Sequence, residues 1–153
     1  MFLDIRDRDS ISDRLQGLRS DTPALFGIMT AQHMVEHLLK TIELSAGKGH
    51  VPLALPLERA ERIKSAVVHT ANPLPYGFKS PLMPSEGLPP LVYPDLASSI
   101  RQLEIGLDEF GRYYNIHPDT KLINPSLGEL NYEEWLVFHG KHFTHHFKQF
   151  GLL

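Results

Sequence analysis

The chain of 153 residues contains no cysteine, and this absence limits the chemistry that is open to it. Without cysteine there is no disulfide, no zinc–thiolate site and no cysteine nucleophile, so histidine, carboxylate or water must hold any metal. A chain without disulfides is typical of the cytosol, and we therefore expect a cytoplasmic protein.

The sequence also lacks long apolar runs and clusters of positive charge. Its apolar runs are far shorter than the roughly 20 residues that a helix needs to cross a bilayer, and the opening MFLDIRDRDS does not resemble a secretion signal. Lysine and arginine number 15 against 18 aspartate and glutamate residues, and no basic run offers a footprint for phosphates. We therefore expect neither a membrane nor a nucleic acid as a partner.

The strict alternation of a half-buried strand is nearly absent, and apolar residues recur instead at spacings of three and four. This pattern predicts an all-α fold, and the length predicts one domain over residues 1–153. We expect a four-helix bundle with an additional short helix. Helices are predicted over about 9–19, over 31–46 behind Thr30 as N-cap, over 57–69 behind Pro56, from Pro94 and Asp95 to about Tyr114, and from Asn131 to about Phe150.

Two details of these helices can be tested against a structure. The inward face of the helix over 57–69 should be formed by Leu57, Ile63 and Val67. The stretch from Thr70 to Val92, TANPLPYGFKSPLMPSEGLPPLV, is rich in proline and glycine, yet too apolar to be a free linker. It is either a cover across the mouth of the bundle or an irregular packed crossover.

Histidines gather near the C-terminal end, where four of the nine fall within eight positions. At about 100° per residue, the last helix places His139, His142 and His146 in one sector, which should face the interior. Because His142 and His146 are four residues apart, both rings can reach one ion. The same sector holds Trp135, Phe143, Gln149 and Phe150, and the opposite, solvated side holds Glu133, Lys141, Thr144 and Lys148.

The second predicted helix supplies another pair of histidines four residues apart, His33 and His37. His37 lies nearer to the apolar sector of that helix, whereas His33 leans toward its polar side. We therefore predict a metal site formed by His37, His142 and His146, with His33 as the weaker rival of His37.

Three imidazoles and an open fourth position are typical of a catalytic metal site, since a structural zinc site is closed by a fourth protein ligand. Imidazole suits zinc, nickel, copper and iron by ligand type, and we expect a divalent transition metal, zinc or nickel. The alternative is that the inward histidines only form hydrogen bonds with their neighbours. Their spacing of four on an inward face favours the metal.

The run HFTHH is not the metalloprotease motif, because Phe143 stands where that motif has the glutamate that acts as general base. His139, one turn before His142, is our candidate for catalytic proton transfer. His145 should lie at the edge beside Glu134 in a structural role. We interpret the remaining histidines as solvated: His50, His69 and His117.

Two segments carry a resemblance to a known family. WLVFHGKHFTHHFKQF resembles the last core helix of the DinB-like (YfiT-like) metalloenzymes, in which an H-x-x-x-H pair is followed by glutamine, here His142, His146 and Gln149. FGIMTAQHMVEHLLKT resembles the earlier metal-bearing helix, whose single histidine matches His37. The pairing of NPSLGELNYEEW with HFTHHFKQF is similar to a branch of that superfamily described only as a domain of unknown function.

The resemblance implies a four-helix bundle with a long crossover, a metal site of three histidines and a homodimer. Some relatives catalyse hydrolysis or the transfer of low-molecular-weight thiols. The resemblance therefore implies a small-molecule substrate, such as a thiol, as the partner of this chain. Phe147 and Lys148 stand where many relatives carry arginine and glycine before the glutamine, and this difference argues against the transfer of one specific thiol substrate.

Three hypotheses follow. The first is a metal-dependent enzyme, in which a water or thiol at the metal becomes the nucleophile. The second is a bundle that binds a metal or a small ligand without catalysis, and the third is a metal-free module with hydrogen-bonded histidines. A carboxylate beside the three histidines would favour the enzyme, and Glu36 and Glu104 are the only candidates.

Overall fold

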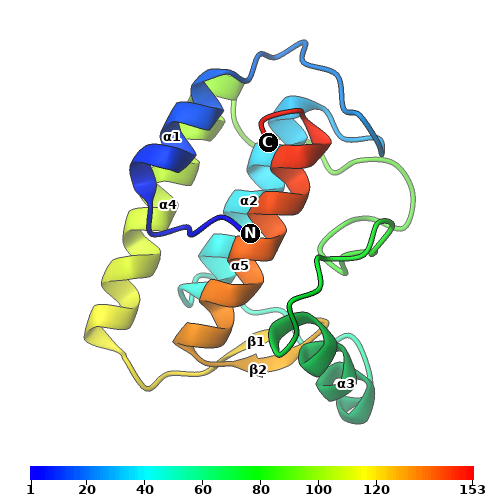
Figure 1. Ribbon diagram of the computed structural model, residues 1–153, viewed down its shortest axis with the longest axis vertical. Helices are drawn as coiled ribbons and strands as arrows, with labels where there is room; N and C mark the ends of the chain where they lie inside the picture. Colours follow the sequence, from blue (N-terminus) through cyan, green and yellow to red (C-terminus); the bar gives the residue numbers. More distant parts are fainter.

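The computed structural model describes residues 1–153 and is predominantly helical, as predicted (Figure 1). It contains two short strands that the sequence does not predict. No helix combines the length and the apolar composition that crossing a membrane requires. In chain order the elements are α1 (Arg8–Gln16), α2 (Ala31–Ser45), α3 (Leu57–Val68), α4 (Leu96–Ile116), β1 (Leu122–Asn124), β2 (Gly128–Leu130) and α5 (Tyr132–Gln149).

The helices begin where short polar side chains can satisfy their free N–H groups. Thr30 accepts from the backbone N–H of His33 and starts α2, as predicted. Asp95 starts α4 in the same way. At α5, Asn131 and Glu134 form a reciprocal capping box, in which each side chain accepts from the other residue's backbone N–H. These local signals explain why the predicted starts of the later helices are close to the observed ones.

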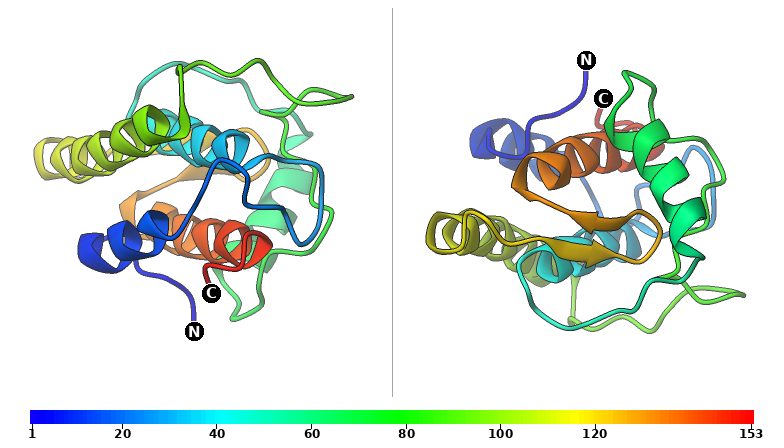
Figure 2. Two further views of the ribbon diagram at one scale, coloured as in Figure 1. Left: turned by 90° about the horizontal axis from the view of Figure 1, so that it is seen from above. Right: turned by 90° about the horizontal axis from the view of Figure 1, so that it is seen from below.

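Four of the helices lie in two layers, with α2 beside α4 in one and α1 beside α5 in the other (Figure 2). Helix α3 lies at one side, where it contacts α5 and β2, and the long loop after α3 returns the chain to α4. The interface between the layers is filled by fully buried side chains: Ile11, Leu15, Met34, Leu38, Ile42, Leu103, Trp135, Phe143 and Phe147.

A small antiparallel hairpin joins α4 to α5 at one end of the molecule (Figure 1). Its two strands have three residues each and pair Leu122 with Leu130 and Asn124 with Gly128. The side chain of Asn124 accepts from the backbone N–H groups of Ser126 and Leu127, which closes the turn. Strands this short carry no readable alternation, and so the sequence does not reveal them.

Helix α3 faces inward with Val67 and Ile63, as predicted, but not with its first turn. Leu57 is 60% exposed, so its assignment to the core is wrong, whereas Ala60 and Val67 are buried. The face of α3 that contains Ala60 and Val67 is buried where the helix contacts α5 and β2. The first turn, which contains Leu57, is not covered.

The side of α5 predicted to be solvated is exposed at Glu133 and Lys148, as predicted, but it is buried between them, at Lys141 and Thr144. The backbone N–H of Leu3 donates to Thr144 Oγ1 at 2.9 Å, so the N-terminal segment runs directly over the helix. A Cβ added at Gly140 would lie 2.5 Å from the Leu3 carbonyl oxygen, and only glycine permits this approach. The prediction that Lys141 and Thr144 face solvent is therefore wrong, because a segment far away in the sequence covers them.

Lys141 is 2% exposed and has no acidic partner. Its Nζ donates to the carbonyl oxygens of Val67 at 2.5 Å and Thr70 at 2.7 Å, at the C-terminal end of α3, and lies 5.1 Å from the centre of the Phe2 ring. A cation is favourable at a helix C-terminus, where the last carbonyl groups lack partners within the helix. Burial lowers the pKa of Lys141. This side chain ties α5 to α3 and to the start of the long loop.

Replacing Lys141 with methionine should lower the free energy of unfolding by about 1–3 kcal/mol, because two carbonyl groups lose their donor. Urea denaturation of wild type and variant measures the difference. Lys148→Met is the matched control, since Lys148 lies on the same helix and is exposed. Equal losses in the two variants would contradict this interpretation of Lys141.

Candidate metal centre

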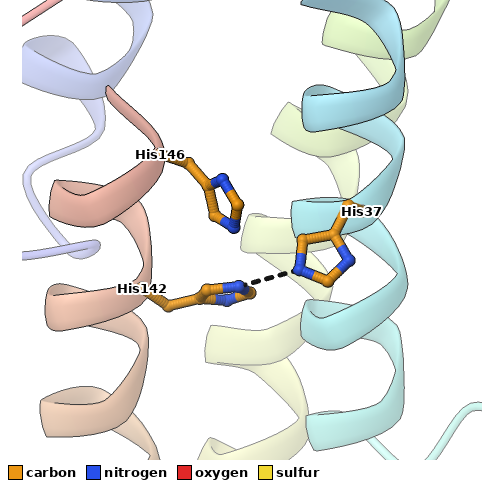
Figure 3. A group of neighbouring side chains, drawn as sticks. All are labelled: His37, His142 and His146. Atoms are coloured by element: carbon orange, nitrogen blue, oxygen red, sulfur yellow. Dashed lines mark hydrogen bonds between the residues drawn. The ribbon is translucent and has the colours of Figure 1, made fainter. Parts of the chain in front are cut away.

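Three histidines from α2 and α5 point toward one another between the two helices (Figure 3). His142 and His146 are four residues apart on α5, so their rings share one face, and His37 approaches them from α2. All three are buried, with 6–7% of each residue exposed. Their ligand nitrogens all lie within 4.8 Å of one another, which is close enough to hold a metal ion.

The contact between His37 and His142 already has the spacing of two ligands on one ion. Their Nε2 atoms are 3.0 Å apart. Two nitrogens bound to zinc at about 2.0–2.1 Å, with an angle of about 90–110° at the metal, would lie about 2.8–3.4 Å apart. The two rings therefore fit a shared ion without a change in their separation.

Burial keeps these imidazoles uncharged, the form that binds metal. It lowers the pKa of His37 to about 4 and that of His146 to about 3, with smaller contributions from neighbouring histidines. It also lowers the pKa of His142 well below the usual value. All three rings are therefore neutral near pH 7, with a lone pair available for a cation.

His33, the rival of His37, is engaged elsewhere. Its Nε2 lies 3.0 Å from the carbonyl oxygen of Pro89, which can only accept, so this nitrogen carries the proton. Its Nδ1 then accepts from the hydroxyl of Thr30 at 2.7 Å. One ring nitrogen thus binds the long loop and the other binds the N-cap of α2, and the structure brings His37 rather than His33 to the cluster.

His139, predicted to transfer protons, lies in the core one turn from His142. Its Nε2 is 2.8 Å from Ser45 Oγ, and its ring stacks on Trp135 with 5.3 Å between centroids. The residue is fully buried, and burial lowers its pKa to about 3. The catalytic role of His139 stays a prediction.

A cavity of about 670 Å³ opens beside the three histidines. One wall consists of residues from α5 and α2, and much of the rest consists of residues from the proline-rich loop between α3 and α4. The lining comprises His37, His142, His145, His146, Ile28, Met29, Leu74, Pro75, Phe78, Lys79, Ser80, Pro81, Met83, Pro84, Ser85 and Gly87.

His145 is the residue of this cavity that sequence reasoning missed. Its ring lies edge-on to Phe26, with 5.4 Å between centroids, and within 5.6 Å of Tyr76. Glu134, its predicted neighbour, instead pairs with Lys64 and with His69. The placement of His145 beside Glu134 is wrong, because the aromatic side chains that surround it come from distant segments.

Neither candidate carboxylate reaches the cavity. Glu36 accepts from the backbone N–H groups of Val92 and Tyr93 at 2.8 and 3.1 Å and holds the end of the long loop. Burial raises the pKa of Glu36, but hydrogen bonds outweigh this effect, and the pKa is lowered overall. Glu104 accepts from the Ser12 hydroxyl, between α4 and α1.

Comparisons of the chain with protein-family models, with curated proteins and with solved structures find no match. The chemistry of the site therefore has to be inferred from its own residues. Three neutral, buried imidazoles that converge at the wall of a cavity can bind a divalent cation and leave one side of it facing the cavity.

The metal-free protein should lose stability as the pH falls from 6.5 to 5. Folded-state pKa values of about 4 for His37 and about 3 for His139 and His146 lie below the usual 6.5, so these three residues take up protons in this window only in the unfolded chain. The loss should be about 1–2 kcal/mol for each histidine. Denaturation in the presence of a chelator measures it. Stability should be level between pH 7 and 8, and a level profile below 6.5 would contradict the neutral-imidazole interpretation.

Proposed function

We propose that the protein is a metal-dependent enzyme that holds one divalent transition metal, zinc or nickel, through His37, His142 and His146. Its reaction on a small-molecule substrate would be hydrolysis or the S-transfer of a low-molecular-weight thiol. The observation that carries the proposal is the convergence of three buried imidazoles at the wall of a cavity of about 670 Å³. Cavities of roughly 300–1,000 Å³ are typical of small-molecule sites.

The proposal includes membership of the DinB-like superfamily and its four-helix bundle. Supporting it are the two layers formed by α1, α2, α4 and α5, and the long crossover from α2 to α4 that contains α3. The positions of His37 on α2 and of His142 and His146 on α5 agree with the motifs that carry the resemblance. A homodimer and a cytoplasmic location belong to the same proposal.

The chain's own residues would bind and orient the substrate. A divalent metal would lower the pKa of a water or thiol bound to it and so supply a nucleophile near pH 7. The apolar side chains of Leu74, Phe78 and Met83 line the cavity and would exclude bulk water from the substrate. His145 lines the same cavity beside His146 and is placed to exchange protons with a bound molecule.

A second candidate function is the binding of a metal or a small ligand without catalysis. One observation favours it: none of the 16 residues that line the cavity is aspartate or glutamate, so no carboxylate base faces this cavity together with the three histidines. A carrier or sensor needs no such base, whereas an enzyme would depend on His145 or on the metal itself.

Protein purified without a histidine tag and without a nickel column should carry about one metal ion per chain. His37→Ala, His142→Ala and His146→Ala should each lose most of it, because each substitution removes one of three ligands. Elemental analysis by mass spectrometry measures the metal content. His50→Ala is the control, since His50 is exposed and lies outside the cluster. Metal-free wild type, unchanged by His142→Ala, would contradict the proposal.

Turnover should depend on His146. We expect a screen of ester hydrolysis, amide hydrolysis and thiol-dependent conjugation to give an activity that falls to background in His146→Ala and is retained in His50→Ala. Activity that survives in His146→Ala would contradict a mechanism centred on the three histidines. Stoichiometric metal without turnover in any of these reactions would favour the non-catalytic function.

A further inference from the structure

The proton of His146 can be located from its hydrogen bonds, and this distinguishes it from the other two histidines. The side chain of Gln149 lies between His146 and the carbonyl group of Phe26. Its Nε2 is 2.9 Å from the Phe26 oxygen, and its Oε1 is 2.7 Å from His146 Nδ1. A backbone carbonyl can only accept, so the amide nitrogen of Gln149 must face Phe26.

The orientation of the amide then determines the state of the ring. With Nε2 toward Phe26, the oxygen of Gln149 faces His146, and an amide oxygen can only accept. His146 Nδ1 must therefore carry the proton and donate it to Gln149. In a neutral ring this leaves the lone pair on Nε2, the nitrogen that faces His37 and His142 (Figure 3).

The Phe26 carbonyl is itself held against the end of α5. The backbone N–H of Leu25 donates to the Gln149 carbonyl oxygen at 2.7 Å, beside the contact made by the Gln149 side chain. Gly27 has φ +77°, a backbone conformation that residues other than glycine rarely adopt. A Cβ at this position would lie 2.8 Å from Gln149 Nε2. The Phe26 ring packs on Tyr76, with 4.8 Å between centroids. Glycine at position 27 is thus required twice, for its backbone conformation and for space.

His37 and His142 have no comparable arrangement. Their Nε2 atoms share a hydrogen bond of 3.0 Å, so without a metal one of these two nitrogens carries a proton. His142 Nδ1 is buried and has no partner in the protein. A metal needs lone pairs on both Nε2 atoms, and one ring of this pair would have to move its proton to Nδ1 on loading. Of the three rings, His146 is the one whose Nδ1 has a hydrogen-bond partner in the protein.

We propose that the Phe26–Gly27 peptide and Gln149 form a positioning device that fixes the proton of His146 on Nδ1 and presents its Nε2 lone pair before any metal binds. The device joins the segment that precedes α2 to the last residue of α5, the two helices that carry the three histidines. Its significance for metal affinity rests on the proposed metal site. The location of the proton does not, and the two can be measured separately.

The location of the proton is measured by ¹⁵N NMR of the histidine side chains in metal-free protein, in a chelator at pH 7.5. Wild type should show His146, assigned by comparison with His146→Ala, as the Nδ1–H tautomer. In Gln149→Met the ring should shift to the Nε2–H tautomer, because a thioether is only a weak acceptor. Gly27→Ala should have the same effect, because the added methyl group displaces the Gln149 amide.

Zinc affinity, measured by competition with a fluorescent chelator, is the second readout. Gln149→Met and Gly27→Ala should raise the zinc Kd about 10–100-fold, the usual effect of removing a group that orients a ligand. Gly49→Ala is the matched control: Gly49 has φ +81°, but a Cβ there meets nothing within 4 Å. It should impose the same backbone strain while leaving the tautomer and the Kd unchanged.

The outcomes test the positioning device and the metal site separately. Nε2–H on His146 in wild type, or Nδ1–H that persists in Gln149→Met, overturns the positioning device, and the wild-type spectrum decides this even if a variant fails to fold. Nδ1–H that depends on Gln149, in a protein that binds no zinc, supports the device and overturns the metal site. An equal rise of the Kd in Gly49→Ala would show general backbone strain and overturn the role of Gly27.

Discussion

The burial of the middle of α5 on all sides, from Phe138 to Thr144, is the constraint on which the rest of the structure depends. Eleven of its eighteen residues are buried, and several of these are polar. A buried polar group needs a partner, and each partner here belongs to a different element. Lys141 binds α3, Thr144 binds the N-terminal segment, His139 contacts α2 through Ser45, and Gln149 binds the segment before α2. The polar residues of one central helix thus specify how the surrounding elements pack against it.

Much of the helical content could be predicted because its signals are local. Thr30 and Asn131 cap helices through contacts within three residues, and the spacing of apolar residues marks each helical face. The burial of Lys141 could not be predicted, because the residues that cover its side of α5 are far away in sequence. Leu3 and Thr144, for example, are separated by 141 positions. A helical projection shows which residues share a face but not whether a second neighbour covers the opposite one.

The candidate site likewise combines features that are local in the sequence, and could be predicted, with contacts between distant segments, which could not. The spacing of His142 and His146 is local, and the apolar flank of α2 correctly favoured His37 over His33 for the cluster. His145 and the Phe26–Gly27 peptide were missed because their surroundings arise only in the folded protein. Phe26 and Gln149 lie 123 positions apart, and no pattern within either segment indicates the hydrogen bond between them. The contact that holds the His146 side chain through Gln149 therefore joins segments that a single sequence does not bring together.

The choice between a metal site and a set of hydrogen-bonded histidines turns on how well the three rings are satisfied by the protein alone. His33 and His146 illustrate a satisfied ring, since His33 has partners at both nitrogens and His146 has one at Nδ1. His142 has only the Nε2 of His37, and its buried Nδ1 has no partner. The His37–His142 pair holds one proton between its two Nε2 atoms, and His146 presents an Nε2 lone pair beside them. A shift of that one proton to Nδ1 would leave three lone pairs for a cation at the wall of the cavity.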